Sequence, residues 1–316
     1  MIINIIYIVL GLSLLVFGAD RLVAGASKLA VSFNVPSLLI GLTIVSFGTS
    51  APELAVSVQS AVAGQGSLAV ANVLGSNTFN ILFILGISAL IAPLVVSQAL
   101  VKRDIPMLVI ACFIVAALVW DGALSRFDAG LLSLLLLLYV VYLFVQGRAL
   151  SHKNDEPASS QQPNRWRERA VNTVQFILGL GLLICGAQLM VDNAVQLART
   201  LAVDEVMIGL TIIAIGTSLP EVVTSVMASI KGHADIAVGN VIGSNLFNLL
   251  GVLGMAGLIS NSPLEVTNRM LSADISVMIV ATLLCTPLLI SGLKLSRREG
   301  GILFVGYVAY FIYTLS

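Results

Sequence analysis

Apolar segments of membrane-spanning length recur along this chain. Neither the first eighteen residues nor the run from Leu131 to Val145 contains a charged side chain. A membrane-spanning helix needs roughly 20 mostly apolar residues, whereas membrane-spanning β-strands alternate apolar and polar side chains. These runs do not alternate. They therefore predict an all-α, polytopic membrane protein.

The composition supports this fold class. Of the 316 residues, 58% are hydrophobic and 10% are charged, whereas soluble domains carry about 25% charged residues. The net charge is zero, so the chain has no basic surface typical of nucleic-acid binding. No basic residue precedes the apolar N-terminus, which favours a first spanning helix over a cleaved signal peptide.

Two sequence blocks occur twice. GLTIVSFGTS at 41–50 returns as GLTIIAIGTS at 209–218, and NVLGSNTFN at 72–80 returns as NVIGSNLFN at 240–248. Both pairs are separated by 168 positions, and seven of ten and seven of nine residues are identical. Two blocks with one shared offset indicate an internal duplication.

The duplication divides the chain into 1–146, a polar linker at 147–170, and 171–316. Five spans are predicted in each half, at 3–30, 37–63, 68–92, 104–120 and 126–146, then at 171–199, 205–230, 235–259, 270–291 and 300–315. An odd number of spans per half predicts ten transmembrane helices in two inverted repeats, as in many secondary transporters.

The placement of basic residues predicts the orientation in the cell membrane. If both termini lie outside, twelve of the sixteen Lys and Arg residues fall on the cytoplasmic side, together with the linker. Cytoplasmic loops normally carry this excess.

Two glutamates lie near the middle of apolar spans. Glu53 and Glu221 occupy equivalent positions of the repeat, each directly after a proline. An ionised acid at this depth costs roughly 3 kcal/mol on insertion scales, so such a residue normally has a polar path or a cation as its partner. No Lys or Arg lies in either span, which predicts a diffusible cation as the partner.

Further oxygen atoms surround these glutamates in the predicted helices. Pro52 has no N–H, so the helix should kink or unwind between Gly48 and Pro52 and release backbone carbonyls. The predicted polar stripes are Ser46, Thr49, Ser50, Glu53 and Ser57; Thr217, Ser218 and Glu221; Asn72, Ser76 and Asn80; and Asn240, Ser244 and Asn248. An all-oxygen set favours hard cations such as Na⁺ and Ca²⁺.

Charge balance favours an exchanger. One Ca²⁺, two Na⁺ or two protons would neutralise two carboxylates, and ions that compete for one site can be exchanged. A channel would need no inverted duplication. An enzyme would need a nucleophile, a histidine cluster or a nucleotide motif, and none accompanies the glutamates, so we predict that the chain is not an enzyme.

The motifs resemble the alpha repeats of the sodium/calcium exchanger family, within the calcium:cation antiporter superfamily. The resemblance rests on GTSAPE at 48–53, GSNTFN at 75–80, GTSLPE at 216–221 and GSNLFN at 243–248. The short linker resembles that of the prokaryotic branch. The resemblance implies a core of the second, third, seventh and eighth helices, across which the first and sixth slide.

The resemblance also implies roles for individual residues. Glu53 and Glu221 would be calcium ligands, with the backbone carbonyls of Thr49 and Thr217. Sodium sites would be lined by Ser50, Ser76, Ser218 and Ser244 and by the carbonyls of Ser46 and Ala214, with Asn80 and Asn248 at the centre. The ions would be cargo rather than cofactors, and the partners would be membrane lipid, Ca²⁺ and Na⁺, without nucleic acid or an obligate protein partner.

One position departs from part of the family. Some relatives carry an acid where this chain has Asn248, and in potassium-dependent relatives that acid is tied to K⁺ use. Asn248 therefore favours Ca²⁺/Na⁺ exchange without K⁺. Ca²⁺/H⁺ antiport is the alternative.

Several other residues are expected to be structural. Asn77 and Asn245 lie off the amide stripe and are expected to form interhelical bonds. Asp20 is expected to make a structural contact or to reach the membrane surface. Cys112, Cys185 and Cys285 are expected to be small core residues.

Overall fold

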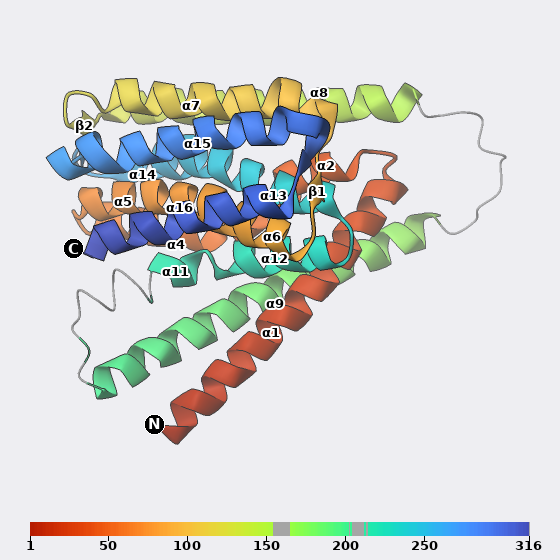
Figure 1. The fold of residues 1–316 in the computed structure, drawn as a ribbon, viewed down its shortest axis with the longest axis horizontal. Helices are drawn as coiled ribbons and strands as arrows, with labels where there is room; N and C mark the ends of the chain where they lie inside the picture. Colours follow the sequence, from red (N-terminus) through yellow and green to blue (C-terminus); the bar gives the residue numbers. More distant parts are fainter. Residues whose placement is uncertain (154–164, 202, 204–211, 213, 316) are drawn as a thin grey trace.

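The computed structural model describes residues 1–153, 165–201, 203, 212 and 214–315. Over these residues the chain is almost entirely helical, which confirms the predicted all-α class (Figure 1). The helical elements of the first half are α1 (Ile2–Ser32), α2 (Ser37–Ile40), η1 (Gly41–Val45), α3 (Ser46–Thr49), α4 (Ala51–Val62), α5 (Gly66–Phe79), η2 (Asn80–Ile84), α6 (Leu85–Ile91), η3 (Leu100–Asp104), α7 (Ile105–Leu118) and α8 (Arg126–Lys153).

The second half repeats this order. Its helical elements are α9 (Arg165–Thr200), α11 (Ala214–Thr217), α12 (Leu219–Ile230), α13 (Ala234–Leu246), η5 (Phe247–Val252), α14 (Leu253–Ile259), η6 (Met270–Asp274), α15 (Ile275–Ile290), η7 (Ser291–Leu293) and α16 (Arg297–Leu315). The elements named η are π-helical turns, except the 3₁₀ turn η7.

Each predicted span coincides with helix in the described residues, although the start of 205–230 lies outside them. By length and apolar composition alone, six described helices could cross a membrane, or seven if the bent pair Ser37–Thr49 and Ala51–Val62 counts as one span. Charged residues at 102–104, directly before α7, and at 297–299, in the first turn of α16, break up the apolar windows of these two helices.

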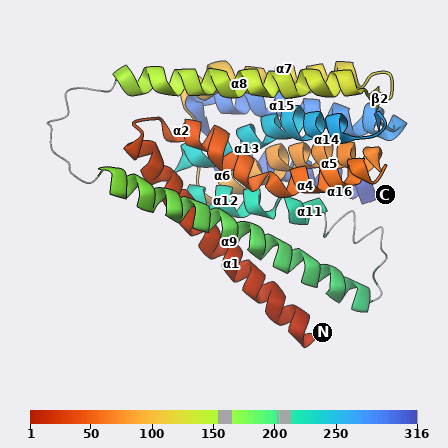
Figure 2. The same cartoon turned by 180° about the vertical axis from the view of Figure 1, so that it is seen from behind.

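The two helices that carry the predicted amides form the centre of the molecule. In Gly66–Ile91 and Ala234–Ile259, 72% and 83% of the most apolar stretch is buried, compared with 28% in α1, α8 and α9. In the views of Figures 1 and 2, α7 and α8 lie on the opposite side of this centre from α1 and α9. The predicted ion site therefore lies in the part of the fold with the least exposure.

Two short antiparallel ladders join the halves. Strand β1 (Leu94–Val95) pairs with β4 (Lys294–Leu295), and β2 (Ala123–Leu124) pairs with β3 (Leu264–Glu265). Directly after β2 and β4, the sequence forms matching capping boxes that start α8 and α16. Ser125 donates its backbone N–H and hydroxyl to Asp128, and Ser296 donates the same groups to Glu299.

Helices α1 and α9 pack along each other over much of their length, as both views show. Glycines bring their backbones together: a Cβ on Gly179 would lie 2.4 Å from the nitrogen of Leu22, and one on Gly18 would lie 2.6 Å from the nitrogen of Leu183. Small residues allow this close approach between membrane helices.

Cys185, on α9, is exposed, so the prediction that it is a core residue was wrong, whereas Cys112 and Cys285 are buried.

Candidate ion-binding site

The helix that carries Glu53 is interrupted as its sequence predicts. Because Pro52 has no N–H, the carbonyl of Gly48 lacks its usual helical donor. Ser50 leaves the helical conformation, with φ −82° and ψ 8°, and the flanking helices are bent by 45°. Ser218 makes the equivalent break before α12, with φ −90° and ψ 5°.

Each glutamate is bound by the serine of the other motif. The Ser218 hydroxyl donates to Oε1 of Glu53 at 2.8 Å, and the Ser50 hydroxyl donates to Oε1 of Glu221 at 2.8 Å. Glu53 is fully buried and Glu221 is 1% exposed. The two GTSxPE motifs therefore meet at one site, and each completes the hydrogen bonding of the other.

The second oxygen of each carboxylate is available for a cation. Oε2 of Glu53 and Oε2 of Glu221 are buried, and neither has a hydrogen-bond partner. Among the described residues, no Lys or Arg forms an ion pair with either glutamate. Buried polar atoms are nearly always paired, so two unpaired carboxylate oxygens indicate a site whose partner is a positive ion.

The central asparagines lie in π-helical turns of the two core helices. Asn80 begins η2, and Asn248 is the second residue of η5. Oδ1 of Asn80 and both polar side-chain atoms of Asn248 are buried without a partner. Single π-turns inside α-helices frequently occur at functional sites. The position of both asparagines in such turns is therefore consistent with a role in the site.

Asn245 lies closer to the asparagines at the centre of the site than the sequence suggested. Asn80 donates from Nδ2 to Oδ1 of Asn245 at 2.9 Å, which confirms the expected interhelical bond of Asn245. The Asn77 side chain, which was also expected to bond between helices, instead donates from Nδ2 to the carbonyl of Val73 in its own helix. The repeated GSN triplet was the signal that could have identified Asn245 as a neighbour of the site.

The remaining predicted residues lie on the same elements. Ser76 is 3.4 Å from the Ser218 hydroxyl, and the Ser244 hydroxyl is 3.5 Å from the Ser46 carbonyl. That carbonyl also accepts the backbone N–H of Ser50 at 3.0 Å, so it is not released from the helix. Thr49 and Thr217 end the short helices α3 and α11, and Ala214 begins α11.

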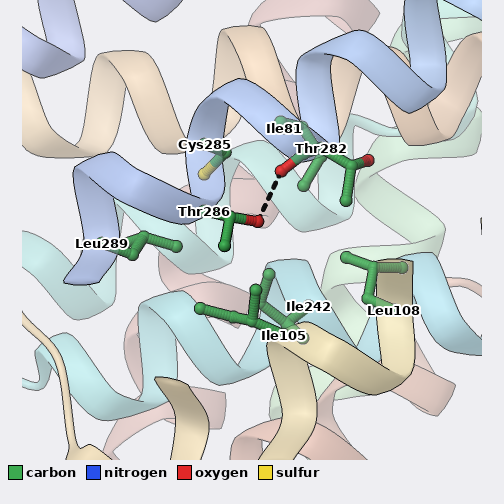
Figure 3. A pocket seen from close by; sticks show the side chains of 8 residues that line it. All are labelled: Ile81, Ile105, Leu108, Ile242, Thr282, Cys285, Thr286 and Leu289. Carbon is green, nitrogen blue, oxygen red and sulfur yellow. Dashed lines mark hydrogen bonds between the residues drawn. The ribbon is translucent and has the colours of Figure 1, made fainter. Parts of the chain in front are cut away.

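A separate pocket lies among apolar residues and does not belong to this site. Figure 3 shows it between α15, α7, η2 and α13, where the hydroxyl of Thr286 donates to the carbonyl of its helical neighbour Thr282 at 2.8 Å. Its lining consists of Ile81, Ile105, Leu108, Ile242, Thr282, Cys285, Thr286 and Leu289. None of the predicted site residues lines this pocket, and its chemistry does not suit a hard cation.

The site and fold match a known family. The model of the sodium/calcium exchanger protein family matches residues 3–147 and 171–316. This chain belongs to the sodium/calcium exchanger family. Members of this family are exchangers. The chain is accordingly a multi-pass membrane antiporter rather than an enzyme.

Relatives of the exchanger family align over nearly all of the chain. The inner membrane protein YrbG of Escherichia coli is 38% identical over 88% of this chain and 86% of its own length. The sodium/calcium exchanger MaX1 of Methanosarcina acetivorans is 31% identical over 98% of both chains. The sodium-calcium exchanger NCX_Mj, soaked with Na⁺ and Sr²⁺, superposes with a TM-score of 0.87 at 30% identity over 99% of this chain and 98% of that one.

Proposed function

We propose that this protein exchanges Ca²⁺ for Na⁺ across the membrane by alternating access. The observation that carries the proposal is the pair of buried glutamates, each bound through one oxygen to the other motif and unpaired at the second. Two carboxylates can be neutralised by one Ca²⁺ or by two Na⁺. The similarity to MaX1 and NCX_Mj, both sodium–calcium exchangers, supports the same pair of ions.

The proposed ligands follow the repeat. Glu53 and Glu221 bind Ca²⁺ with the carbonyls of Thr49 and Thr217. Na⁺ is bound by the hydroxyls of Ser50, Ser76, Ser218 and Ser244 and by the carbonyls of Ser46 and Ala214, with Asn80 and Asn248 between the sites. Because both ions need the same carboxylates, binding of one favours release of the other.

The proposed topology has ten spans in two inverted halves, 1–146 and 171–316. Both termini face outward, and the linker at 147–170 is cytoplasmic. The basic residues support this orientation. Reporter fusions at the C-terminus should be active only with an enzyme that works outside the cytoplasm; activity of a cytoplasmic reporter there would contradict the orientation.

The deciding experiment is ⁴⁵Ca²⁺ uptake into proteoliposomes under separately imposed Na⁺, K⁺ and H⁺ gradients. We expect an outward Na⁺ gradient to drive uptake, with no requirement for K⁺. If more than two Na⁺ exchange for one Ca²⁺, uptake should also respond to membrane potential, because each net charge is worth about 2.3 kcal/mol per 100 mV. Uptake driven by a pH gradient without Na⁺ would instead establish Ca²⁺/H⁺ exchange.

A further inference from the structure

Asn240 lies next to the ion site, but its amide is already engaged. It is fully buried. Its Nδ2 donates to the hydroxyl of Ser225 at 3.0 Å, and its Oδ1 accepts from the hydroxyl of Thr49 at 3.1 Å. The same hydroxyl lies 3.2 Å from the carbonyl of Ser46 in its own helix. The sequence placed Asn240 on the polar stripe that faces the ion. With bonds made by both ends of its amide, it is better suited to hold other residues than to bind an ion.

The repeat contains a matching asparagine. Asn72 donates from Nδ2 to the hydroxyl of Ser57 at 2.9 Å and to the carbonyl of Glu53 at 3.2 Å. Ser57 and Ser225 each lie four residues after a glutamate, which is one helical turn away on the same face. The amide-to-serine bond thus occurs at equivalent positions in both halves, and in each it reaches the helix that carries the carboxylate.

Asn240 additionally connects the two halves. Thr49 is the last residue of α3, directly before the break at Ser50, whereas Ser225 belongs to α12, which carries Glu221. A second link runs beside this one, from the Ser50 hydroxyl to Glu221. That second link uses groups expected to bind ions, so it must change when an ion enters. The link through Asn240 uses side-chain atoms that have no assigned role as ligands.

We propose that Asn240 is a positioning residue for the ion site. It keeps the broken end of α3 at a fixed distance from α12, so that the Thr49 carbonyl and the Glu221 carboxylate stay directed at one cation. Asn72 plays the related part for α4 through Ser57. The inference rests on the proposed function, because it takes Ca²⁺ as the ion, and it goes further by naming what fixes the ligands in place.

The test uses threonine variants that leave the backbone carbonyl in place. Thr49→Val removes the hydroxyl with little change of shape, and Thr49→Ser keeps it. Asn240→Leu removes the amide, and the double variant combines both losses. Thr43→Val is the matched control, because the Thr43 hydroxyl donates to the carbonyl of Leu39 in its own helix and, among the described residues, to no group of the other half.

Two readouts are needed for purified, reconstituted protein. The first is the Ca²⁺ concentration for half-maximal ⁴⁵Ca²⁺ uptake, together with the maximal rate. The second is the Ca²⁺ concentration that half-saturates the rise in melting temperature, which reports binding without any assumption about the coupling ion.

We expect Thr49→Val and Asn240→Leu each to raise both Ca²⁺ concentrations by about two- to tenfold, with a smaller change in maximal rate. The effect of the double variant should be clearly smaller than the two single effects combined, because both variants break the same link between Thr49 and Asn240. Thr49→Ser keeps the hydroxyl and should therefore raise both Ca²⁺ concentrations less than Thr49→Val does. Thr43→Val should stay within about twofold of the wild type. Should Asn240→Leu fail to fold, Ser225→Ala, which removes the other partner of the Asn240 amide, replaces it in the double variant with Thr49→Val.

Three results would overturn the inference. Thr49→Val with unchanged Ca²⁺ affinity would show that the hydroxyl holds nothing of importance. Additive effects in the double variant would show that Asn240 acts independently, as a direct ligand would. A lower melting temperature in Asn240→Leu with wild-type affinity would show a purely structural role. A wild-type protein that neither binds nor transports Ca²⁺ would instead refute the proposed function.

Discussion

The proposed ion site and the α1/α9 pair are built by opposite means. At the site, directional side-chain bonds cross between the halves, and the two bonds from serine to glutamate have the same length. Between α1 and α9, the two backbones are in direct contact at Gly18 and Gly179. Directional bonds hold one arrangement, whereas a glycine-lined contact brings two helices close without interlocking side chains.

The two regions also differ in symmetry. The two Ser–Glu bonds are related by the internal repeat, whereas the contacts of α1 and α9 with the core are not. A Cβ on Gly48 would meet Leu180, and a Cβ on its counterpart Gly216 would meet Val191; both of these side chains belong to α9. Under exact repeat symmetry, one of them would belong to α1. The proposed site is thus built equally from both halves. The unequal contacts of α1 and α9 with the core belong to the single conformation that the structure shows.

The largest expected effect comes from removing one of the two charges at the site. Glu53→Gln or Glu221→Gln should reduce ⁴⁵Ca²⁺ uptake to background, because a single carboxylate cannot neutralise Ca²⁺. Melting temperature and yield, measured in parallel, should remain near those of the wild type. Uptake above a tenth of the wild-type rate in either variant would contradict the site assignment.

The next effect tests the glycine contact. Gly179→Val should destabilise the protein by about 1–3 kcal/mol, because the new side chain overlaps the backbone of α1 at Leu22. Gly181→Val is the control, since nothing lies within 4 Å of a Cβ at that position on the same helix. Equal melting temperatures for the two variants would show that α1 and α9 are not held this closely.

A smaller effect tests the symmetry of the site. Ser50→Ala and Ser218→Ala each remove one donor to a carboxylate. Each should raise the Ca²⁺ concentration for half-maximal uptake by about tenfold, which is the lower end of the range for a hydrogen bond to a charged group. The two effects should agree within about threefold. A large difference between them would show that the halves contribute unequally to binding.

The smallest effect concerns an ion pair without a counterpart in the repeat. Asp20 of α1 lies 2.6 Å from Lys231, at the end of α12, and their side chains are 39% and 28% exposed. The positions equivalent to these two residues hold Gln188 and Ala63. Exposed pairs contribute at most about 1 kcal/mol, so Asp20→Asn should change the maximal exchange rate less than about fivefold. A changed Ca²⁺ affinity would place Asp20 in the binding site instead.

Much of this structure could be predicted from sequence where the signal is local. Apolar runs predict the helices, the shared offset predicts the repeat, and Pro52 predicts the break at Ser50. The crossed pairing of Ser50 with Glu221 could not be predicted, because it depends on how the halves meet. The exposure of Cys185 was missed because a lipid-facing surface is as apolar as a core.

The shortest elements also gave no sequence signal. A strand of two residues, such as β1, is too short to show alternation, and its partner β4 lies near the other end of the chain. These features were found only when the tertiary structure was known.

The crossed serine–glutamate bonds have a consequence for biogenesis. A ribosome adds about 5–20 residues per second, so Glu53 is made roughly ten seconds or more before Ser218, the hydroxyl that binds it. During that interval, the nascent first half holds a glutamate at mid-membrane without its later partner. It must rely on water, on the insertion machinery or on its own neighbours until the second half arrives.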